Sequence, residues 1–472
     1  MNHIKKLAAC TAATLFLPLG GKQLHAQSNI TPEILKTLES AQTHTPSDRA
    51  LRNAVSSNSI NKMALDLQHA SSAPDTYFSL ETKNSGISDQ QSSGRCWLFT
   101  GLNVLRHQAM KKLGTTNFFF SQIYCFFYDQ LEKSNLFLQG IIDTRRLSID
   151  DRQVMWLFEN PLSDGGTYTG VADLVSKYGV VPQEVMAETY VSNSTSEFNG
   201  HLKRKLREYG ILLREKADKG AGVKELEAEK VEMMKTVYRM LTLAYGEPVK
   251  SFTWAPKDAN GKAMAEAKTY TPLEFYKMVS DGTDLNADYV MLMNDPSRPY
   301  NKVYEIAYDR HVYDGHNWLY LNLDIEEIKP LCIASIRDSV QMYFSCDVGK
   351  QMNRANGLLD IKNYDYGSLF GTTFGMNKKQ RIQSRDSGSS HAMTLMAVDL
   401  DANERPTKWK VENSWGASNG FAGHLIMTDE WFNEYMFRVV VHKKYLSEAQ
   451  QKLLKQKPIQ LPAWDPMFME EE

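Results

Sequence analysis

One cysteine stands at the junction of a polar loop and an apolar segment. Cys96 follows "DQQSSGR" and precedes "WLFTG" within residues 89–101. If Cys96 begins a helix, its sulfur lies at the helix N-terminus, where the partial positive charge favours a thiolate. A cysteine nucleophile also needs a base to take its proton and a third group to orient that base. The position of Cys96 therefore predicts a nucleophile whose partners lie elsewhere in the chain.

A histidine and an asparagine far along the chain are the candidate partners. His391 opens the apolar run "HAMTLMAVDL", and Asn413 lies near the end of the next run, "KWKVENSW". Two adjacent antiparallel strands would bring their side chains together. Taken singly, a core histidine and a turn asparagine are the more common explanations. Their joint occurrence with Cys96 and Gln90 favours a Cys–His–Asn arrangement.

Helices dominate the first half of the chain. Apolar residues recur at helical spacing after Cys96, and two lysines lie in the last turn, where cations suit the helix dipole. Residues 201–250 carry 12 basic and 8 acidic residues, which indicates a solvated helical pair, with an oligomer or polyanion contact as the alternative. Helices are predicted over 97–113, over 118–138 and within 171–182.

The second half of the chain changes to strand-like runs. From Asp288 onward, short apolar runs rich in β-branched and aromatic residues follow one another, which predicts strands. Helices first and strands afterwards indicate an α+β fold. The expected strands are "DYVMLM", "HNWLYLNL", "CIASI" (332–336), "MYFSC", "HAMTLMAVDL", "KWKVENSW", "HLIMTD" and "FRVVVH".

Composition narrows the class of protein. The chain has 472 residues and a net charge of −2, which gives no global attraction to nucleic acid or anionic membranes. No CxxC pair occurs, so a structural zinc site is not expected, and no cofactor motif is present. Cys125, Cys332 and Cys346 are too few for a disulfide scaffold, so we expect buried free thiols.

The first 26 residues have the order of a secretory signal. Lys5 and Lys6 precede an apolar run of about 15 residues, which is too short to span a bilayer. Ala26 is a plausible residue before cleavage, so residues 1–26 are predicted to be a signal peptide. Lipidation at Cys10 is the weaker alternative. We therefore expect an exported protein, periplasmic or secreted, without a membrane span after cleavage.

Two motifs carry a family resemblance. "QQSSGRCW" and "VENSWG" resemble the papain superfamily of cysteine peptidases. Ser93 replaces the usual first cysteine, Arg95 replaces a small residue, and the histidine lies much further downstream than the family's usual spacing. These departures are typical of the bleomycin hydrolase or aminopeptidase C branch. The resemblance extends over most of the chain, through "SQIYCFFYDQLEKSN", "DGGTY", "VSKYGVVP", "CDVGKQMNRANGLLD" and "LPAWDPM".

The resemblance implies a papain-like fold and roles for individual residues. Cys96 would be the nucleophile, and His391 its base and later the acid for the leaving amine. Asn413 would hold the imidazole ring. Gln90 and the Cys96 backbone N–H would donate to the oxyanion.

Supporting positions follow from the same resemblance. Trp97 would support the nucleophile, and Trp415 would shield the His–Asn hydrogen bond from water. Gly165 and Gly166 would let a substrate backbone approach closely. Plain core packing for Trp415 and a simple turn for the glycines are the alternatives.

The resemblance also concerns the end of the chain and the assembly. The tail would lie in the active-site cleft, where the carboxylate of Glu472 would meet the free amine of a peptide substrate. Family members form barrel-shaped homohexamers, which is the expected assembly. The predicted divisions are a signal peptide (1–26), a nucleophile-bearing helical part (27–195), an insertion with a role in oligomerisation (196–330), a β-rich part (331–448) and the tail (449–472).

Three functions remain open at this point. The leading prediction is an aminopeptidase without cofactor or metal. An endopeptidase or transferase could use the same residues. An inactive homologue acting as a binding assembly is a third possibility, although the complete set of Cys96, His391, Asn413 and Gln90 argues against it. Nucleic-acid binding is not favoured by the charge.

Overall fold

The computed structural model describes residues 29–70, 75–83 and 86–468, so the predicted signal peptide and Glu472 lie outside the described residues. The chain divides into two compact units, residues 1–63 and 64–472. The first contains α1 (Pro32–Ser40) and α2 (Pro46–Ser57). Both begin with a threonine N-cap whose hydroxyl accepts a backbone N–H, and both carry proline in the first turn.

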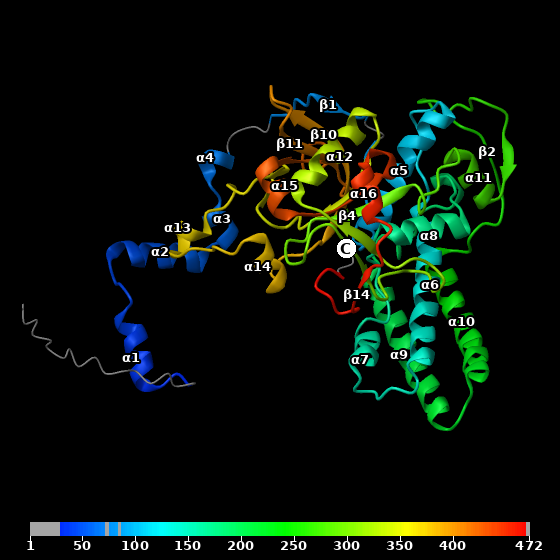
Figure 1. The fold of residues 1–472 in the computed structure, drawn as a ribbon, viewed down its shortest axis with the longest axis horizontal. Helices are drawn as coiled ribbons and strands as arrows, with labels where there is room; N and C mark the ends of the chain where they lie inside the picture. Colours follow the sequence, from blue (N-terminus) through cyan, green and yellow to red (C-terminus); the bar gives the residue numbers. More distant parts are fainter. Residues whose placement is uncertain (1–28, 71–74, 84–85, 469–472) are drawn as a thin grey trace, which may run out of the picture. The chain divides into compact units, whose positions relative to one another are not determined.

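Helices cover the sheet of the second unit (Figure 1). Helix α5, which begins at Cys96, packs against α8 and two central strands, and α6, α9 and α10 pack together as a helical arm. The helices are α3 (Ile60–Ala64, across the division), α4 (Leu67–Ala70), α5 (Cys96–Leu113), α6 (Gln122–Asp143), α7 (Arg152–Glu159), α8 (Tyr168–Tyr178), α9 (Ser196–Asp218), α10 (Val223–Tyr245), α11 (Pro272–Val279), α12 (Ile325–Arg337), α13 (Tyr366–Phe370), α14 (Lys378–Gln383), α15 (Asp429–Tyr435) and α16 (Glu448–Leu453).

A single mixed sheet organises the β part of the described chain. Its order is β14-β5-β6-β4-β13-β7-β10-β11-β12-β9-β8, with β1 paired to β10 as well, and most pairs are antiparallel. The strands are β1 (Leu80–Glu81), β4 (Tyr289–Met293), β5 (Lys302–Ile306), β6 (Leu319–Asn322), β7 (Met342–Cys346), β8 (Met352–Asn353), β9 (Leu358–Leu359), β10 (His391–Leu400), β11 (Pro406–Glu412), β12 (His424–Thr428), β13 (Met436–His442) and β14 (Ile459–Leu461); β2 (Phe252–Trp254) and β3 (Lys268–Tyr270) form a separate pair.

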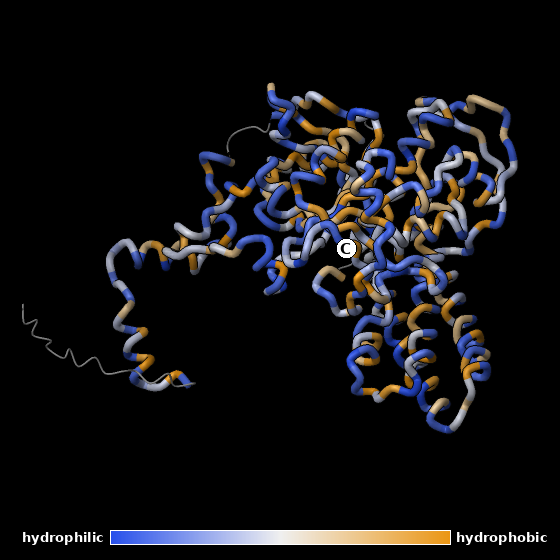
Figure 2. Tube along the Cα trace, in the orientation of Figure 1, coloured by the Kyte–Doolittle hydropathy of each residue, from blue (hydrophilic) through white to orange (hydrophobic). Residues whose placement is uncertain are grey.

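The central strands are apolar on both faces because both faces are covered. One core contains Cys96 and Trp97 together with α6, α8 and α10, and a second core packs α12 and α15 on the strands. Figure 2 shows the hydrophobic chain gathered around the sheet, whereas the turn that joins α9 to α10 is hydrophilic. This burial fixes α5 against the sheet, where the candidate site lies.

One prediction about the second half of the chain needs correction. "CIASI" forms part of α12 and not a strand. Asp324 caps this helix, two glutamates lie in its first turn, and Ile328, Leu331 and Cys332 are buried at helical spacing. The predicted boundary after residue 330 lies within α12, and the strands β4, β5 and β6 of the large sheet lie within residues 196–330, so the division of the chain stays a prediction.

Among the described residues, none of the helices combines the length and the apolar character needed to pass through a bilayer.

Candidate active site

Cys96 is the first residue of α5. The polar loop before it ends at the N-cap Arg95, and the helix then packs against β10. The backbone N–H of Ala392, the second residue of β10, donates to Cys96 Sγ at 3.4 Å. This N–H and the helix N-terminus both stabilise negative charge on the sulfur. Helix α5 and strand β10, which begins with His391, therefore meet at Cys96.

His391 and Asn413 are brought together by strand register. β10 and β11 are antiparallel with Thr394 opposite Glu412, so the start of β10 lies beside the residues that follow β11. His391 Nε2 lies 2.8 Å from Asn413 Oδ1, which also accepts the Ser414 N–H at 2.8 Å. An amide oxygen only accepts, so Nε2 carries the ring hydrogen and Nδ1 is the basic nitrogen of the neutral ring.

Trp415 and Trp97 take different places around this pair. Trp415 is half-buried, and its ring lies over His391 with centroids 4.7 Å apart and a tilt of 32°. It thus covers the imidazole beside the His–Asn bond. Trp97 is fully buried, and its indole N–H donates to the carbonyl of Asp164 at 2.8 Å. Trp97 therefore ties α5 to the loop that contains Gly165.

Gln90 is fixed between the strand end and the nucleophile loop. Its backbone N–H donates to Ser414 O at 2.8 Å, next to Asn413. The Ser414 hydroxyl donates to Gln90 Oε1 at 2.6 Å, and Gln90 Nε2 donates to Ser93 O at 2.6 Å. These bonds set the orientation of the amide. Nε2 carries two hydrogens, so one remains for a ligand.

The two glycines of the "DGG" segment are buried. The Lys133 ammonium donates to the carbonyl of Gly165. A Cβ on Gly166 would lie 2.2 Å from the His311 ring and 2.7 Å from Trp97. Close packing by His311 therefore explains glycine at 166 without a ligand. Substrate contact at Gly165 and Gly166 stays a prediction.

The other cysteines differ from Cys96. Among the described residues, Cys125, Cys332 and Cys346 are buried and form no disulfide, which confirms the expectation of buried thiols. Burial raises the pKa of Cys125 to about 12, with a smaller contribution from the nearby Asp129 charge. Burial also raises the pKa of Cys332. Both thiols therefore stay protonated and unreactive.

A cavity of about 450 Å³ adjoins the candidate residues. Its lining includes Ser163, which precedes the glycines, and Ser390, which precedes His391. Phe468 of the C-terminal segment lines the same cavity and packs edge-to-face on Trp156 with ring centroids 5.3 Å apart. The C-terminal segment therefore reaches the cleft beside the candidate site.

Several cations hold this C-terminal segment in place. Arg438, which is buried, donates to the carbonyl of Met467 at 2.7 Å. Asp465 pairs with Arg298, and β14 adds in parallel to β5. Burial raises the pKa of Asp465 despite the nearby arginine. The end of the chain is thus built into the fold up to Phe468.

Comparison with known proteins decides the family. Residues 29–468 match the Peptidase C1-like family. The chain belongs to the peptidase C1-like family. It is a cysteine-type peptidase with the papain-like α+β fold.

Individual relatives match over most of this peptidase. It is 38% identical to aminopeptidase C of Lactobacillus delbrueckii subsp. lactis over 420 residues, which cover 88% of this chain and 92% of the relative. It is 41% identical to human bleomycin hydrolase over 389 residues, or 81% and 85% of the two chains. The crystal structure of PepW from Lactobacillus rhamnosis matches with a TM-score of 0.89 and 36% identity, covering 94% and 99%.

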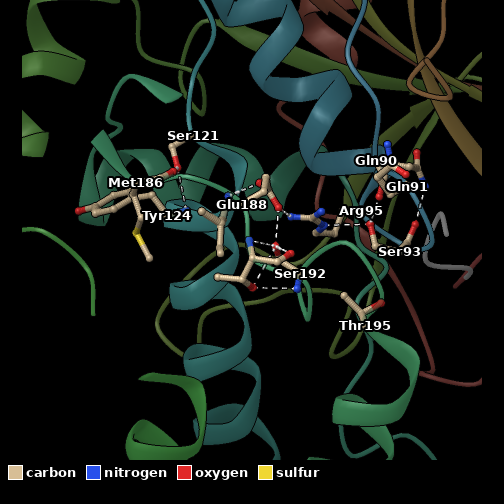
Figure 3. A network of polar contacts seen from close by, with 12 residues as sticks. Gln90, Gln91, Ser93, Arg95, Ser121, Tyr124, Met186, Glu188, Ser192 and Thr195 are labelled. Carbon is tan, nitrogen blue, oxygen red and sulfur yellow. Dashed lines mark hydrogen bonds and ion pairs between the residues drawn. The ribbon is translucent and has the colours of Figure 1, made fainter. Parts of the chain in front are cut away.

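Sequence reasoning missed the charged residues that support the site of this peptidase. Arg95 was noticed only as a departure from the papain pattern, yet its Nη1 lies 2.7 Å from Glu188 Oε2 (Figure 3). Glu188 stands in an ordinary polar segment, and the two residues lie 93 positions apart. No local signal in the sequence connects them.

A second supporting group lies under the glycine segment. His311 Nδ1 lies 2.5 Å from Asp129 Oδ1, and the Thr167 N–H donates to His311 Nε2 at 3.4 Å. The His311 ring packs edge-to-face on Trp97 at 4.6 Å. Burial opposes the charge on Asp129, but Lys133 and His311 outweigh it and hold its pKa below the usual value. The glycine segment of this peptidase therefore rests on a buried ionic cluster.

A third group joins α5 to the strand that precedes Asn413. Arg106 Nη2 lies 2.8 Å from Glu412 Oε1, and both side chains are buried. Burial raises the pKa of Glu412 to about 7, although Arg106 works in the opposite direction. Glu412 Oε2 has no hydrogen-bond partner among the described residues. This pair spans the two halves of the peptidase next to the candidate site.

Proposed function

We propose that this peptidase is an aminopeptidase that removes residues one at a time from the free N-terminus of peptides. The observation that carries the proposal is that Cys96 Sγ accepts the N–H of Ala392, the residue after His391, while His391 pairs with Asn413 beside a cleft that the C-terminal segment enters. The similarity to aminopeptidase C supports the same activity. A cleft that is lined by the C-terminal segment of the chain suits a substrate that itself ends there.

The geometry supports a defined role for each side chain. The Cys96 sulfur attacks the carbonyl carbon of the scissile bond, and its proton passes to His391 Nδ1. The oxygen that gains negative charge is received by Gln90 Nε2 and the Cys96 N–H. His391 then gives the proton to the leaving amine, while Asn413 keeps the ring in place. Water, deprotonated by His391, cleaves the remaining thioester and frees the thiol.

Other residues bind and shield. The backbone at Gly165 and Gly166 would lie along the substrate main chain. Trp415 keeps water from the His–Asn bond, which strengthens it in a low dielectric. Trp97 fixes the first turn of α5 through Asp164. No step requires a metal or cofactor.

The carboxylate of Glu472 is proposed to capture the ammonium group of the substrate. Phe468 already lines the cavity, and four residues can extend at most about 14 Å from it. A charge-assisted hydrogen bond of this kind contributes about 1.5–3 kcal/mol, or about tenfold to a hundredfold in affinity. Such a contact would select free N-termini over acetylated ones.

Removal of the tail tests this proposal directly. The intact enzyme should cleave a free dipeptide reporter and ignore its acetylated form. Deleting Phe468 to Glu472 should lower cleavage of the free reporter and allow cleavage inside acetylated peptides. A matched variant lacking only the last three glutamates keeps Phe468 and separates the effect of charge from that of bulk. Unchanged rates and unchanged rejection of acetylated peptides in the longer deletion would refute the role of the tail.

The nucleophile has its own test. Cys96→Ser keeps the size of the side chain but replaces a thiol by a much weaker nucleophile, so turnover should be abolished. The thermal midpoint should stay close to that of the parent enzyme. Activity within about tenfold of the parent would show that another residue attacks the substrate.

Export and assembly complete the proposal. Residues 1–26 are proposed to direct export and to be removed, so the native protein should begin near Gln27. A homohexamer is supported by exposed apolar side chains on the helical arm. N-terminal sequencing and the native mass test both points; an intact Met1 or a monomer mass would refute them. The exposed apolar residues of the arm are Ile211, Leu212, Val223, Val231, Tyr238 and Leu243.

A further inference from the structure

The residue before the nucleophile carries a buried charge. Arg95 is the N-cap of α5 and is 0% exposed, and its guanidinium lies near the rings of Phe99 and Phe126 at 5.2 and 5.3 Å. Its Nη1 donates to Glu188 Oε2 at 2.7 Å. A buried arginine is retained only where its charge is paired. The pair therefore stands one residue from the attacking sulfur.

The same arginine closes the loop that contains Gln90. Arg95 Nε donates to Ser93 Oγ at 2.9 Å, and this hydroxyl donates to Gln90 O at 2.6 Å. Gln90 Nε2 donates back to Ser93 O at 2.6 Å. Three hydrogen bonds thus join residues 90, 93 and 95 into one unit, as Figure 3 shows.

Glu188 connects this unit to the helical body. Its Oε1 accepts the Ile123 N–H at 3.1 Å in the first turn of α6, where a negative charge is favoured. Its Oε2 accepts the Ser192 hydroxyl at 2.6 Å. Both carboxylate oxygens are therefore fixed by the protein. Arg95 is held by a group that cannot turn away without breaking these bonds.

We propose that Arg95 and Glu188 are positioning residues, which hold Gln90 and the Cys96 N–H where the oxyanion forms. The inference rests on the proposed function, because it assigns those two donors to the transition state. Donors to an oxyanion act only when they are aimed before charge develops, since reorientation during the reaction would consume their stabilisation. The network supplies this rigidity from two sides of the loop.

The planar fork of arginine is what this site requires. One guanidinium reaches Ser93 Oγ with Nε and Glu188 with Nη1 at the same time. A lysine has a single ammonium and cannot hold two acceptors in this fixed geometry. Arg95→Lys should therefore lower kcat although it keeps the charge.

Glu188→Gln is the main test, because it keeps the size of the side chain and removes the charge. We expect kcat on a free-amine reporter to fall about tenfold, with KM within about twofold, since a displaced donor loses part of its effect. Alkylation of Cys96 by iodoacetamide creates no oxyanion, so its rate should not change. Affinity for a peptide aldehyde, whose carbonyl oxygen uses the oxyanion donors after sulfur addition, should fall with kcat.

Two further variants separate positioning from stability. Glu434→Gln removes the partner of Arg381, another largely buried arginine, and should leave kcat unchanged. In a Gln90→Ala background, Glu188→Gln should lose most of its effect, because the donor that it positions is already absent. Ser192→Ala loosens Glu188 without a charge change and gives a second measurement if Glu188→Gln folds poorly.

The outcomes are distinct. The positioning role would be overturned if Glu188→Gln lowered the alkylation rate as much as kcat. It would also be overturned if Glu188→Gln lowered kcat by the same factor in the Gln90→Ala background as in the parent enzyme. If the intact enzyme cleaves no free-amine peptide, the proposed function fails, and the ratio of aldehyde affinities still decides whether Glu188 positions the donors. A selective fall in kcat and aldehyde affinity would support the inference.

Discussion

Two fully buried carboxylates support helix α5, one from the helical part of the fold and one from the sheet. Asp129 of α6 lies under the glycine segment and reaches α5 through His311 and Trp97. Glu412 ends β11 and reaches α5 through Arg106. The pKa of Asp129 is lowered, whereas that of Glu412 is raised to about 7. Burial is nearly complete at both, so burial alone does not explain the difference.

The number of partners explains it. Asp129 has Lys133, His311 and Gln130 within hydrogen-bond or ion-pair distance. Glu412 has one contact with Arg106, and its second oxygen has none among the described residues. A single opposite charge does not offset the desolvation of a carboxylate, whereas several hydrogen bonds and charges do. Each buried acid in this fold must therefore be judged by its full set of partners.

Removal of the well-paired acid should have the largest effect on stability. Asp129→Ala leaves His311 and Lys133 without their carboxylate and should lower the free energy of unfolding by about 3–5 kcal/mol. Asp129→Asn, which keeps the volume and one acceptor, should cost less. Urea unfolding of both variants measures the difference. A loss below about 1 kcal/mol for the alanine variant would show that the cluster stabilises little.

Glu412, the acid with few partners, should make the stability of the protein depend on pH near neutrality. Its folded pKa of about 7 lies above the ordinary 4.5, so between these values the folded protein keeps a proton that the unfolded chain has lost. Stability from this group therefore falls as pH rises from about 4.5 to 7, by at most about 3 kcal/mol. Glu412→Gln should remove this dependence. Identical curves of unfolding free energy against pH for parent and variant would contradict it.

The acid limb should show the opposite sign for Asp129. Because its folded pKa is lowered, its contribution is present above the ordinary value of 3.8 and is lost as pH falls through the folded pKa. Asp129→Asn should therefore flatten the loss of stability in acid, while the slope of stability against pH in the neutral range stays that of the parent. Urea unfolding between about pH 2 and 5 checks this. A change confined to neutral pH would show that a group other than Asp129 causes the loss of stability in acid.

Replacement of both charges of the Arg106–Glu412 pair should have the smallest effect on stability. Arg106→Met combined with Glu412→Leu removes an ion pair that makes few other hydrogen bonds, and such replacements are often neutral or stabilising. We expect unfolding free energies within about 1 kcal/mol of the parent at pH 7, with Arg106→Met alone clearly worse. Additive losses in the double variant would show that the pair contributes more than its contacts suggest.

Local patterns predicted most elements of the fold. The helix after Cys96 and the strand that begins at His391 have the predicted positions, because their apolar residues follow the period of the element. The strand predicted for "CIASI" was wrong because a short apolar run of this length suits a buried helix as well as a strand. The features that decide for a helix are the Asp324 cap and the packing on the sheet, and both lie outside the run itself.

The sequence by itself determined the identity of the candidate residues and the family. Cys96, His391, Asn413 and Gln90 stand in motifs specific enough to name, because the chemistry requires those residue types. Only the tertiary structure decided what supports them. Arg95 meets Glu188 across 93 residues, His311 meets Asp129 across 182, and Arg106 meets Glu412 across 306. Such pairs leave no periodic trace in the sequence, since burial of opposite charges is settled by how distant elements pack and not by local propensity.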